Sequence, residues 1–106
     1  MDINDWRAKI DEIDRELVRL LNERARCVME IGRIKRDNKL PIQEPHREQQ
    51  VLRNALVTNR GPLSSQAMER VFERIVEEGR ALQRELFESA EPKSPTGSQQ
   101  PPKAGS

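Results

Sequence analysis

The pattern of apolar and polar positions along the chain predicts a long first helix with one apolar face. From residue 7 to residue 35, positions spaced alternately by three and four residues form one face, here called the seam, as in a coiled coil. The seam consists of Arg7, Ile10, Asp14, Leu17, Leu21, Arg24, Val28, Ile31 and Lys35. A second stripe beside it consists of Trp6, Ile13, Leu20, Cys27 and Ile34. We expect this face to be buried, with Cys27 as a small core residue.

Capping residues, proline and glycine set the expected ends of three helices. The segment DNKLP predicts a turn before Pro41, and Gly61 with Pro62 predicts a second break. The helices are expected up to about residue 37 after a cap at Asp2 or Asn4, from Pro45 to about Asn59, and up to about Glu88 after a cap at Ser64 or Ser65. No segment alternates long enough to indicate a strand, so the expected fold class is all-α.

Length and composition limit the chain to one domain with a small core. The 106 residues are 35% charged and 34% hydrophobic, and the aromatic residues are Trp6, Phe72 and Phe87. A core this poor is often completed by oligomerisation. We therefore expect one domain over residues 1–88, with long, short and medium helices in an intertwined homodimer. Residues 89–106 hold four of the seven prolines and are expected to form a disordered tail rich in Pro, Ser and Gly.

The charge balance and the rare residues exclude several classes of function. The net charge is +1, with basic and acidic residues spread along the chain, which argues against nucleic acid or membrane partners. The sequence contains one cysteine, Cys27, and one histidine, His46. Unless they meet, disulfides, zinc sites, Ser/His/Asp triads and Cys/His pairs lack their parts. With no apolar leader after Asp2, the expected location is cytoplasmic.

Three cations on the seam are candidate ligand-binding residues. At about 1.5 Å per residue, Arg24 and Lys35 lie roughly 16 Å apart along the helix, and Arg7 lies roughly 25 Å before Arg24. An antiparallel copy with its dyad near residue 18 would bring a second Arg7 between Arg24 and Lys35. The cations could instead reach solvent, or pair with a partner's carboxylate such as Asp14. Because unpaired buried charge is costly, three cations favour an anionic ligand in a dimer.

The other helices supply further candidates. The third helix has an apolar face of Met68, Phe72, Ile75, Gly79, Leu82 and Leu86. Gln83 lies at its edge and could donate to a ligand, although most helical glutamines are surface residues. A glycine within a helix costs about 1 kcal/mol, so Gly79 indicates close approach of a helix or a ligand. Glu44, Arg47 and Glu48 surround the start of the second helix, where acidic residues are also common for dipole reasons.

Taken together, these residues resemble the all-helical class of chorismate mutases. The similar segments are WRAKIDEIDRELVRLLNERARCVMEIGRIK, LPIQEPHREQQVL and VFERIVEEGRALQ, which cover about residues 5 to 86. The resemblance implies conversion of chorismate to prephenate in phenylalanine and tyrosine biosynthesis. This intramolecular Claisen rearrangement needs no nucleophile, metal or cofactor. Negative charge builds on the ether oxygen of a dicarboxylate, so clamping and donors aimed at that oxygen accelerate it.

The resemblance also implies a role for each candidate residue in two shared sites of a dimer. Arg24 of one subunit and the partner subunit's Arg7 would bind the two carboxylates, while Lys35 and Gln83 would flank the ether oxygen. Glu48, helped by Glu44, would orient the ring hydroxyl, and Arg47 would line the pocket. Relatives often have aspartate in place of Glu44 and serine in place of Gly79. These departures are expected to weaken substrate affinity before they affect the chemistry.

Two alternative functions stay open at this point. Isochorismate pyruvate lyases share the arginine and lysine framework, but tend to be apolar at the position of Glu48, which favours the mutase. A non-catalytic helical dimerisation module would keep the fold without needing Lys35.

Overall fold

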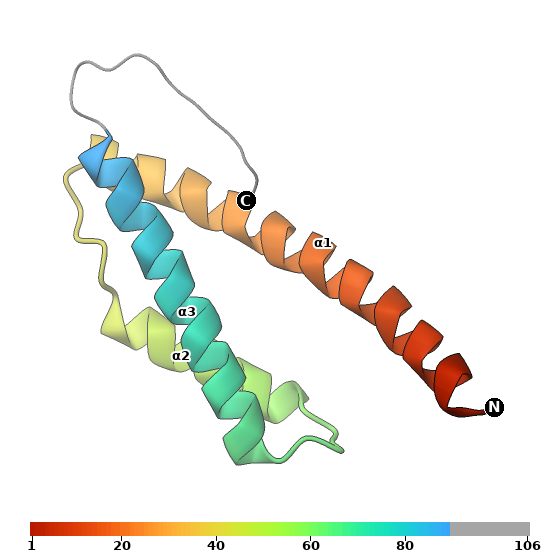
Figure 1. Cartoon of the computed structure of the whole chain (residues 1–106). Coiled ribbons are helices and arrows are strands. Elements are labelled where there is room, and N and C mark those ends of the chain that lie inside the picture. Colours follow the sequence, from red (N-terminus) through yellow and green to blue (C-terminus); the bar gives the residue numbers. More distant parts are fainter. Residues whose placement is uncertain (90–106) are drawn as a thin grey trace.

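The structure, a computed structural model, describes residues 1–89 and consists of three helices (Figure 1). These are α1 (Ile3–Asp37), α2 (Pro45–Thr58) and α3 (Ser65–Glu88). No strand is present in these residues, so the predicted all-α fold and all three helices are confirmed. The predicted tail lies outside the described residues, apart from Ser89.

Local hydrogen bonds explain where α1 and α3 begin. Asp2 and Asp5 form a capping box, in which each side chain accepts a hydrogen bond from the backbone N–H of the other. Ser64 accepts a hydrogen bond from the N–H of Ala67 at 3.0 Å and caps α3. Both caps satisfy N–H groups that the helix leaves unpaired, so these two boundaries follow from short sequence motifs.

The end of α1 is a turn that folds the chain back toward the helix. The N–H of Leu40 donates to the carbonyl of Lys35 at 2.7 Å, and the N–H of Lys39 donates to Arg36 at 3.2 Å. Lys39 has a φ of 57°, the left-handed conformation that this Schellman arrangement requires after a helix. The turn brings the segment before α2 back to α1, where the carbonyl of Ile42 reaches the side chain of Lys35.

Helix α3 is the central element because it packs against both other helices, whereas α1 and α2 do not pack against each other (Figure 1). The contact of α1 with α3 is close at Gly32. A Cβ atom on Gly32 would lie 3.0 Å from Cγ of Gln83 and 3.1 Å from Cδ1 of Leu86. The absence of a side chain at Gly32 therefore lets Gln83 lie directly against α1.

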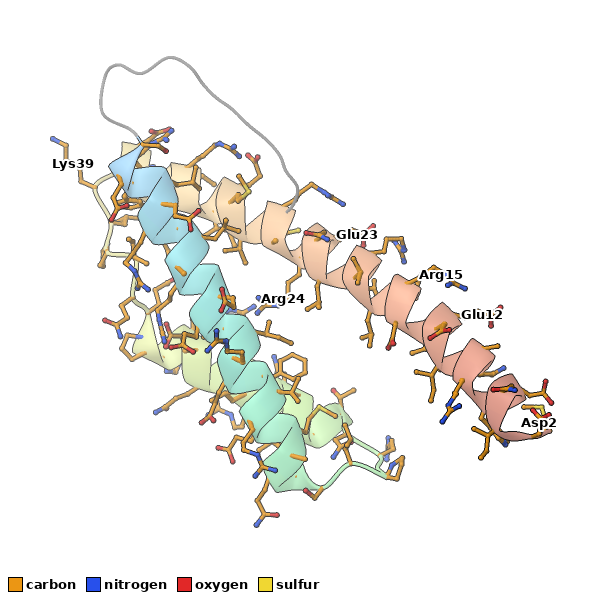
Figure 2. All side chains as sticks on the ribbon, in the orientation of Figure 1. Asp2, Glu12, Arg15, Glu23, Arg24 and Lys39 are labelled. Carbon is orange, nitrogen blue, oxygen red and sulfur yellow. The ribbon has the colours of Figure 1, made fainter. Side chains whose placement is uncertain are left out.

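The single chain is open. Its radius of gyration is 17.1 Å, whereas a compact chain of about 100 residues has a value of about 13 Å. No apolar residue within residues 1–89 is buried. The first part of α1, residues 3–21, here called the arm, projects away from α2 and α3 (Figures 1 and 2). Its apolar residues are exposed, including Trp6 at 56% and Ile10 at 53%.

The expected burial of the first-helix face is correct within one chain only near the end of α1. Arg24 and Val28 are half-buried and Lys35 is buried, because α3 packs on this part of the helix. The prediction that Cys27 is a core residue is wrong for the single chain, in which Cys27 is exposed. Cys27 belongs to the second stripe, and Ile34 of the same stripe is also exposed. α3 covers only the adjacent seam.

Substitution of two helical glycines provides a test of the α1–α3 contact. Gly79→Ala should raise the free energy of unfolding by up to about 1 kcal/mol, because alanine favours the helix and the added Cβ would make only ordinary contacts. Gly32→Ala should lose this gain because its Cβ would press on Gln83 and Leu86. Thermal unfolding of both variants at equal protein concentration measures the difference. Equal stabilisation by the two substitutions would contradict the close contact at Gly32.

Candidate active site

A cavity lies where the end of α1, the segment before α2, the start of α2 and the middle of α3 come together. Its volume is about 120 Å³. Its walls combine six charged side chains and Gln83 with an apolar lining. The lining residues are Arg24, Val28, Ile31, Lys35, Ile42, Glu44, Arg47, Glu48, Val51, Val76, Gly79, Arg80 and Gln83. One of the six, Arg80, also lines a second hollow.

Lys35 is the most enclosed charged residue of this cavity, at 7% exposed. Its Nζ donates to the carbonyl of Ile42 at 2.7 Å and to Oε1 of Gln83 at 3.2 Å. Nζ also forms an ion pair with Oε1 of Glu44 at 2.9 Å. An ammonium has three protons, so each proton has an acceptor. A ligand can bind Lys35 only by replacing one of them, and the half-exposed Glu44 is the partner that water can most easily solvate.

Gln83 is held in one orientation by α1. It is 5% exposed, and its Nε2 donates to the carbonyl of Val28 at 2.9 Å while its Oε1 accepts from Lys35. The amide nitrogen carries a second proton. That proton can serve a ligand that enters beside Lys35. The alternative that Gln83 is a surface glutamine does not hold, because its side chain is buried in the contact of α3 with α1.

Arg24 and Arg47 make one wall of the cavity strongly positive. Arg24 extends from α1 toward α3 (Figure 2), and one of its guanidinium nitrogens would lie 3.9 Å from a Cβ built on Gly79. Within residues 1–89, Arg24 has no ion pair. Burial, followed by the charge of Arg47, lowers the pKa of Arg24. Arg47 donates to Gln50 at 2.7 Å and, like Arg24, forms no ion pair with a carboxylate of residues 1–89.

Glu48 is another carboxylate of the cavity lining, and it is paired. Its Oε1 accepts from Nη1 of Arg80 at 2.8 Å. The walls therefore combine two arginines without a carboxylate partner, a buried ammonium and a fixed amide donor. Such a site can bind an anion and stabilise negative charge that develops beside Lys35 and Gln83.

Known proteins are similar to this chain in fold and in sequence. The sequence model of the family "Chorismate mutase type II" matches residues 6–84. The chain belongs to the chorismate mutase type II family. A solved chorismate mutase from Thermus thermophilus (Form II) has a TM-score of 0.76 and 34% identity, over 77% of this chain and 93% of that chain.

Two curated members of the family show how the matched region relates to whole proteins. A chorismate mutase from Methanocaldococcus jannaschii is 28% identical over 89 residues, which are 83% of this chain and 90% of that protein. A bifunctional chorismate mutase/prephenate dehydratase from Stutzerimonas stutzeri is 35% identical over 85 residues, or 76% of this chain. The chain spans 23% of the length of that bifunctional relative. No helix among the described residues has the length and apolar character to cross a membrane.

The cavity brings together seven of the eight residues that the sequence singled out for substrate contact or catalysis. They are Arg24, Lys35, Glu44, Arg47, Glu48, Gly79 and Gln83. Arg7 is the exception, because it lies exposed on the arm, away from the cavity of its own chain. The long separation of Arg7 from Arg24 along one straight helix explains this outcome.

The close approach inferred at Gly79 is not a steric requirement of the helices. A Cβ on Gly79 would lie 3.6 Å from Cγ1 of Val28, which is ordinary contact, so an alanine would fit. Gly32 is the glycine at which helices approach closely. Sequence reasoning missed it although it lies between the seam residues Ile31 and Lys35.

Sequence reasoning also missed two other contributors to the site, the side chain of Arg80 and the backbone carbonyl of Ile42. Arg80 lies three positions before Gln83 on α3, a spacing that could have indicated a shared face. The acceptor at Ile42 had no such signal, because a backbone carbonyl carries no sequence information and depends on the turn after α1.

Replacing Arg24 should stabilise the protein. Its lowered pKa means that the folded protein holds this proton less tightly than the unfolded chain, so the charge costs stability at any pH below that pKa. Arg24→Met should raise the free energy of unfolding by about 0.5 kcal/mol, the scale of a screened charge interaction, and added salt should shrink the gain. The exposed Arg26→Met is the control in urea unfolding. A less stable Arg24→Met protein would mean that Arg24 has a compensating partner.

Proposed function

We propose that the protein is a chorismate mutase that converts chorismate to prephenate in the biosynthesis of phenylalanine and tyrosine. The observation that carries the proposal is the juxtaposition of Lys35 and Gln83, 3.2 Å apart and both buried, in a cavity with two uncompensated arginines. In the rearrangement the ether C–O bond breaks while a C–C bond forms within the same molecule, and no group leaves. The protein needs only to hold the reactive conformation and stabilise the charge on the ether oxygen.

Each wall of the cavity has a part in this proposal. Arg24 binds one carboxylate of the substrate, and Arg47 adds positive charge beside it. Lys35 and the second amide proton of Gln83 donate to the ether oxygen, where charge grows in the transition state. Glu48 accepts a hydrogen bond from the ring hydroxyl. In this assignment the cations contact the negative groups of a dianion, and the carboxylate of Glu48 contacts its hydroxyl group.

Glu44 has two parts in the proposed cycle. In the free protein its carboxylate pairs with Lys35 at 2.9 Å and thereby compensates the buried ammonium. When the substrate arrives, the ether oxygen replaces this carboxylate, and Glu44 turns toward solvent or the ring hydroxyl. The exchange leaves Lys35 with three acceptors throughout, which avoids the cost of an unpaired buried donor.

The proposal includes a homodimer with two shared sites, each completed by the partner subunit's Arg7. Support comes from the exposed apolar arm of α1 and from the radius of gyration of 17.1 Å. The cavity of about 120 Å³ is also smaller than small-molecule sites, which begin at about 300 Å³. The arm of a second chain would bury the exposed apolar arm of the first chain. It would also add walls to the cavity of the first chain.

The catalytic domain in this proposal comprises residues 1–88 and works in the cytoplasm.

The name of the bifunctional relative joins a chorismate mutase to a prephenate dehydratase, so in that protein prephenate has a consumer in the same chain. This pairing supports prephenate as the product here.

The first test is turnover by the protein and by a Lys35 variant. The purified chain should consume chorismate, measured as loss of its ultraviolet absorbance, and form prephenate. Lys35→Ala should lower kcat by about 10²-fold or more, the effect of removing one donor from a developing oxyanion. Lys39→Ala, which removes an exposed lysine four residues later, should leave kcat unchanged.

The same assay distinguishes the proposed reaction from its alternatives. Pyruvate release from isochorismate without loss of chorismate would identify a lyase in place of a mutase. Normal turnover of chorismate by Lys35→Ala, with its helical circular dichroism intact, would remove Lys35 from the reaction. No turnover of either substrate by the unaltered chain would leave a non-catalytic helical module.

Subunit mixing tests the shared site. Arg7→Ala and Lys35→Ala should each be inactive as homodimers, but their heterodimer should hold one complete site. After full exchange of equal amounts, activity should recover to about a quarter of the normal value, because half of the dimers are mixed and each has one working site of two. The control is a mixture of Arg24→Ala with Lys35→Ala, whose defects lie in the same subunit's part of the site and cannot be rescued. Equal recovery in both mixtures, or recovery in neither, would rule out the proposed sharing.

A further inference from the structure

The ion pair of Arg80 with Glu48 differs from most ion pairs of residues 1–89. The others, apart from Lys35 with Glu44, join residues within four positions of each other. Arg80 and Glu48 lie 32 positions apart and join α3 to α2 at 2.8 Å. Their side chains are only 25% and 24% exposed. Both long-range pairs line the same cavity, which links them to the site and not to the general surface.

The start of α2 has little besides Arg80 to fix the carboxylate of Glu48. The residue before the helix, Glu44, makes no side-chain hydrogen bond to the helix, because its carboxylate is paired with Lys35. The N–H of Glu48 donates to the carbonyl of Glu44 at 2.9 Å, which fixes the backbone but leaves the side-chain rotamers free. The orientation of the carboxylate therefore depends on the guanidinium of Arg80.

Arg80 stands between two spaces. One is the cavity described above, and the other is a hollow lined also by Pro41, Ile42, Gln43, Glu77 and Arg84. Nη1 of Arg80 engages Oε1 of Glu48, while Oε2 of Glu48 has no hydrogen-bond partner within residues 1–89. The pair thus holds one oxygen of Glu48 at the wall and leaves the other available to a ligand.

We propose that Arg80 is a positioning residue that acts through Glu48: it directs the free oxygen of this carboxylate toward the ring hydroxyl of the bound substrate. The inference rests on the proposed function and deepens it, because it assigns recognition of the hydroxyl to a pair of residues from two helices. Arg80 then determines how well the site distinguishes a hydroxylated ring from one without the hydroxyl.

The test compares chorismate with an analogue that lacks the ring hydroxyl, using the full chain. The unaltered protein should prefer chorismate, and Arg80→Met should reduce this preference, the ratio of the two kcat/KM values, by about tenfold, the scale of one charge-assisted hydrogen bond. The loss should lie mainly in KM, because the hydroxyl contact exists in the ground state and the transition state. The ratio does not depend on the fraction of folded protein, so partial unfolding of a variant cannot imitate the result.

Three further variants separate positioning from other effects. Arg80→Lys, which keeps the charge and one donor, should restore part of the preference. Arg84→Met removes a neighbouring exposed arginine and should leave the preference unchanged. In a protein with Glu48→Gln, the added Arg80→Met should change the preference no further, because both substitutions interrupt the same contact.

The outcomes also distinguish this inference from the proposed function. If the unaltered protein converts chorismate but Arg80→Met lowers turnover of both substrates equally, Arg80 contacts the substrate directly or supports the fold, and positioning is refuted. An unchanged preference in Arg80→Met refutes it equally. Failure of the unaltered protein to convert chorismate overturns the proposed function, and the inference with it.

Discussion

The burial of the Lys35 ammonium is the constraint on which the rest of the structure depends. A buried cation is tolerated only when its protons have acceptors, and two separate parts of the chain provide them. The segment between α1 and α2 brings the carbonyl of Ile42 and the carboxylate of Glu44, and α3 brings Gln83. The packing of α3 on α1 and the path of the connecting segment are therefore tied to one charged group.

Some charged residues of the cavity have a partner of opposite charge, and others have none. Lys35 and Glu48 have partners of opposite charge, whereas Arg24 and Arg47 repel each other without a carboxylate between them. An arrangement of this kind lowers the stability of the empty protein and raises its affinity for an anion. The same reasoning applies to the arm, whose exposed apolar residues are unfavourable in a single chain and favourable against a second one.

Much of the fold and part of the site could be predicted from the sequence. Caps such as Asp2 and Ser64, and the seam with its period of three and four, depend on neighbouring residues and were interpreted correctly. The inward position of Arg24 and Lys35 followed from the same period. Cys27 is not a core residue of the single chain, because periodicity identifies a face but cannot say how much of that face another helix of the same chain covers.

The sequence by itself determined three helices, their ends and a line of cations on one helical face, since these depend on interactions within a few residues. Only the tertiary structure decided which groups those cations meet. The pairing of Arg80 with Glu48 spans 32 residues and joins α3 to α2, and the contact of Lys35 with Gln83 spans 48 residues. The contact of Lys35 with Gln83 depends on how closely α3 approaches α1. Gly32 permits that approach, and its effect appears only when the two helices are placed together.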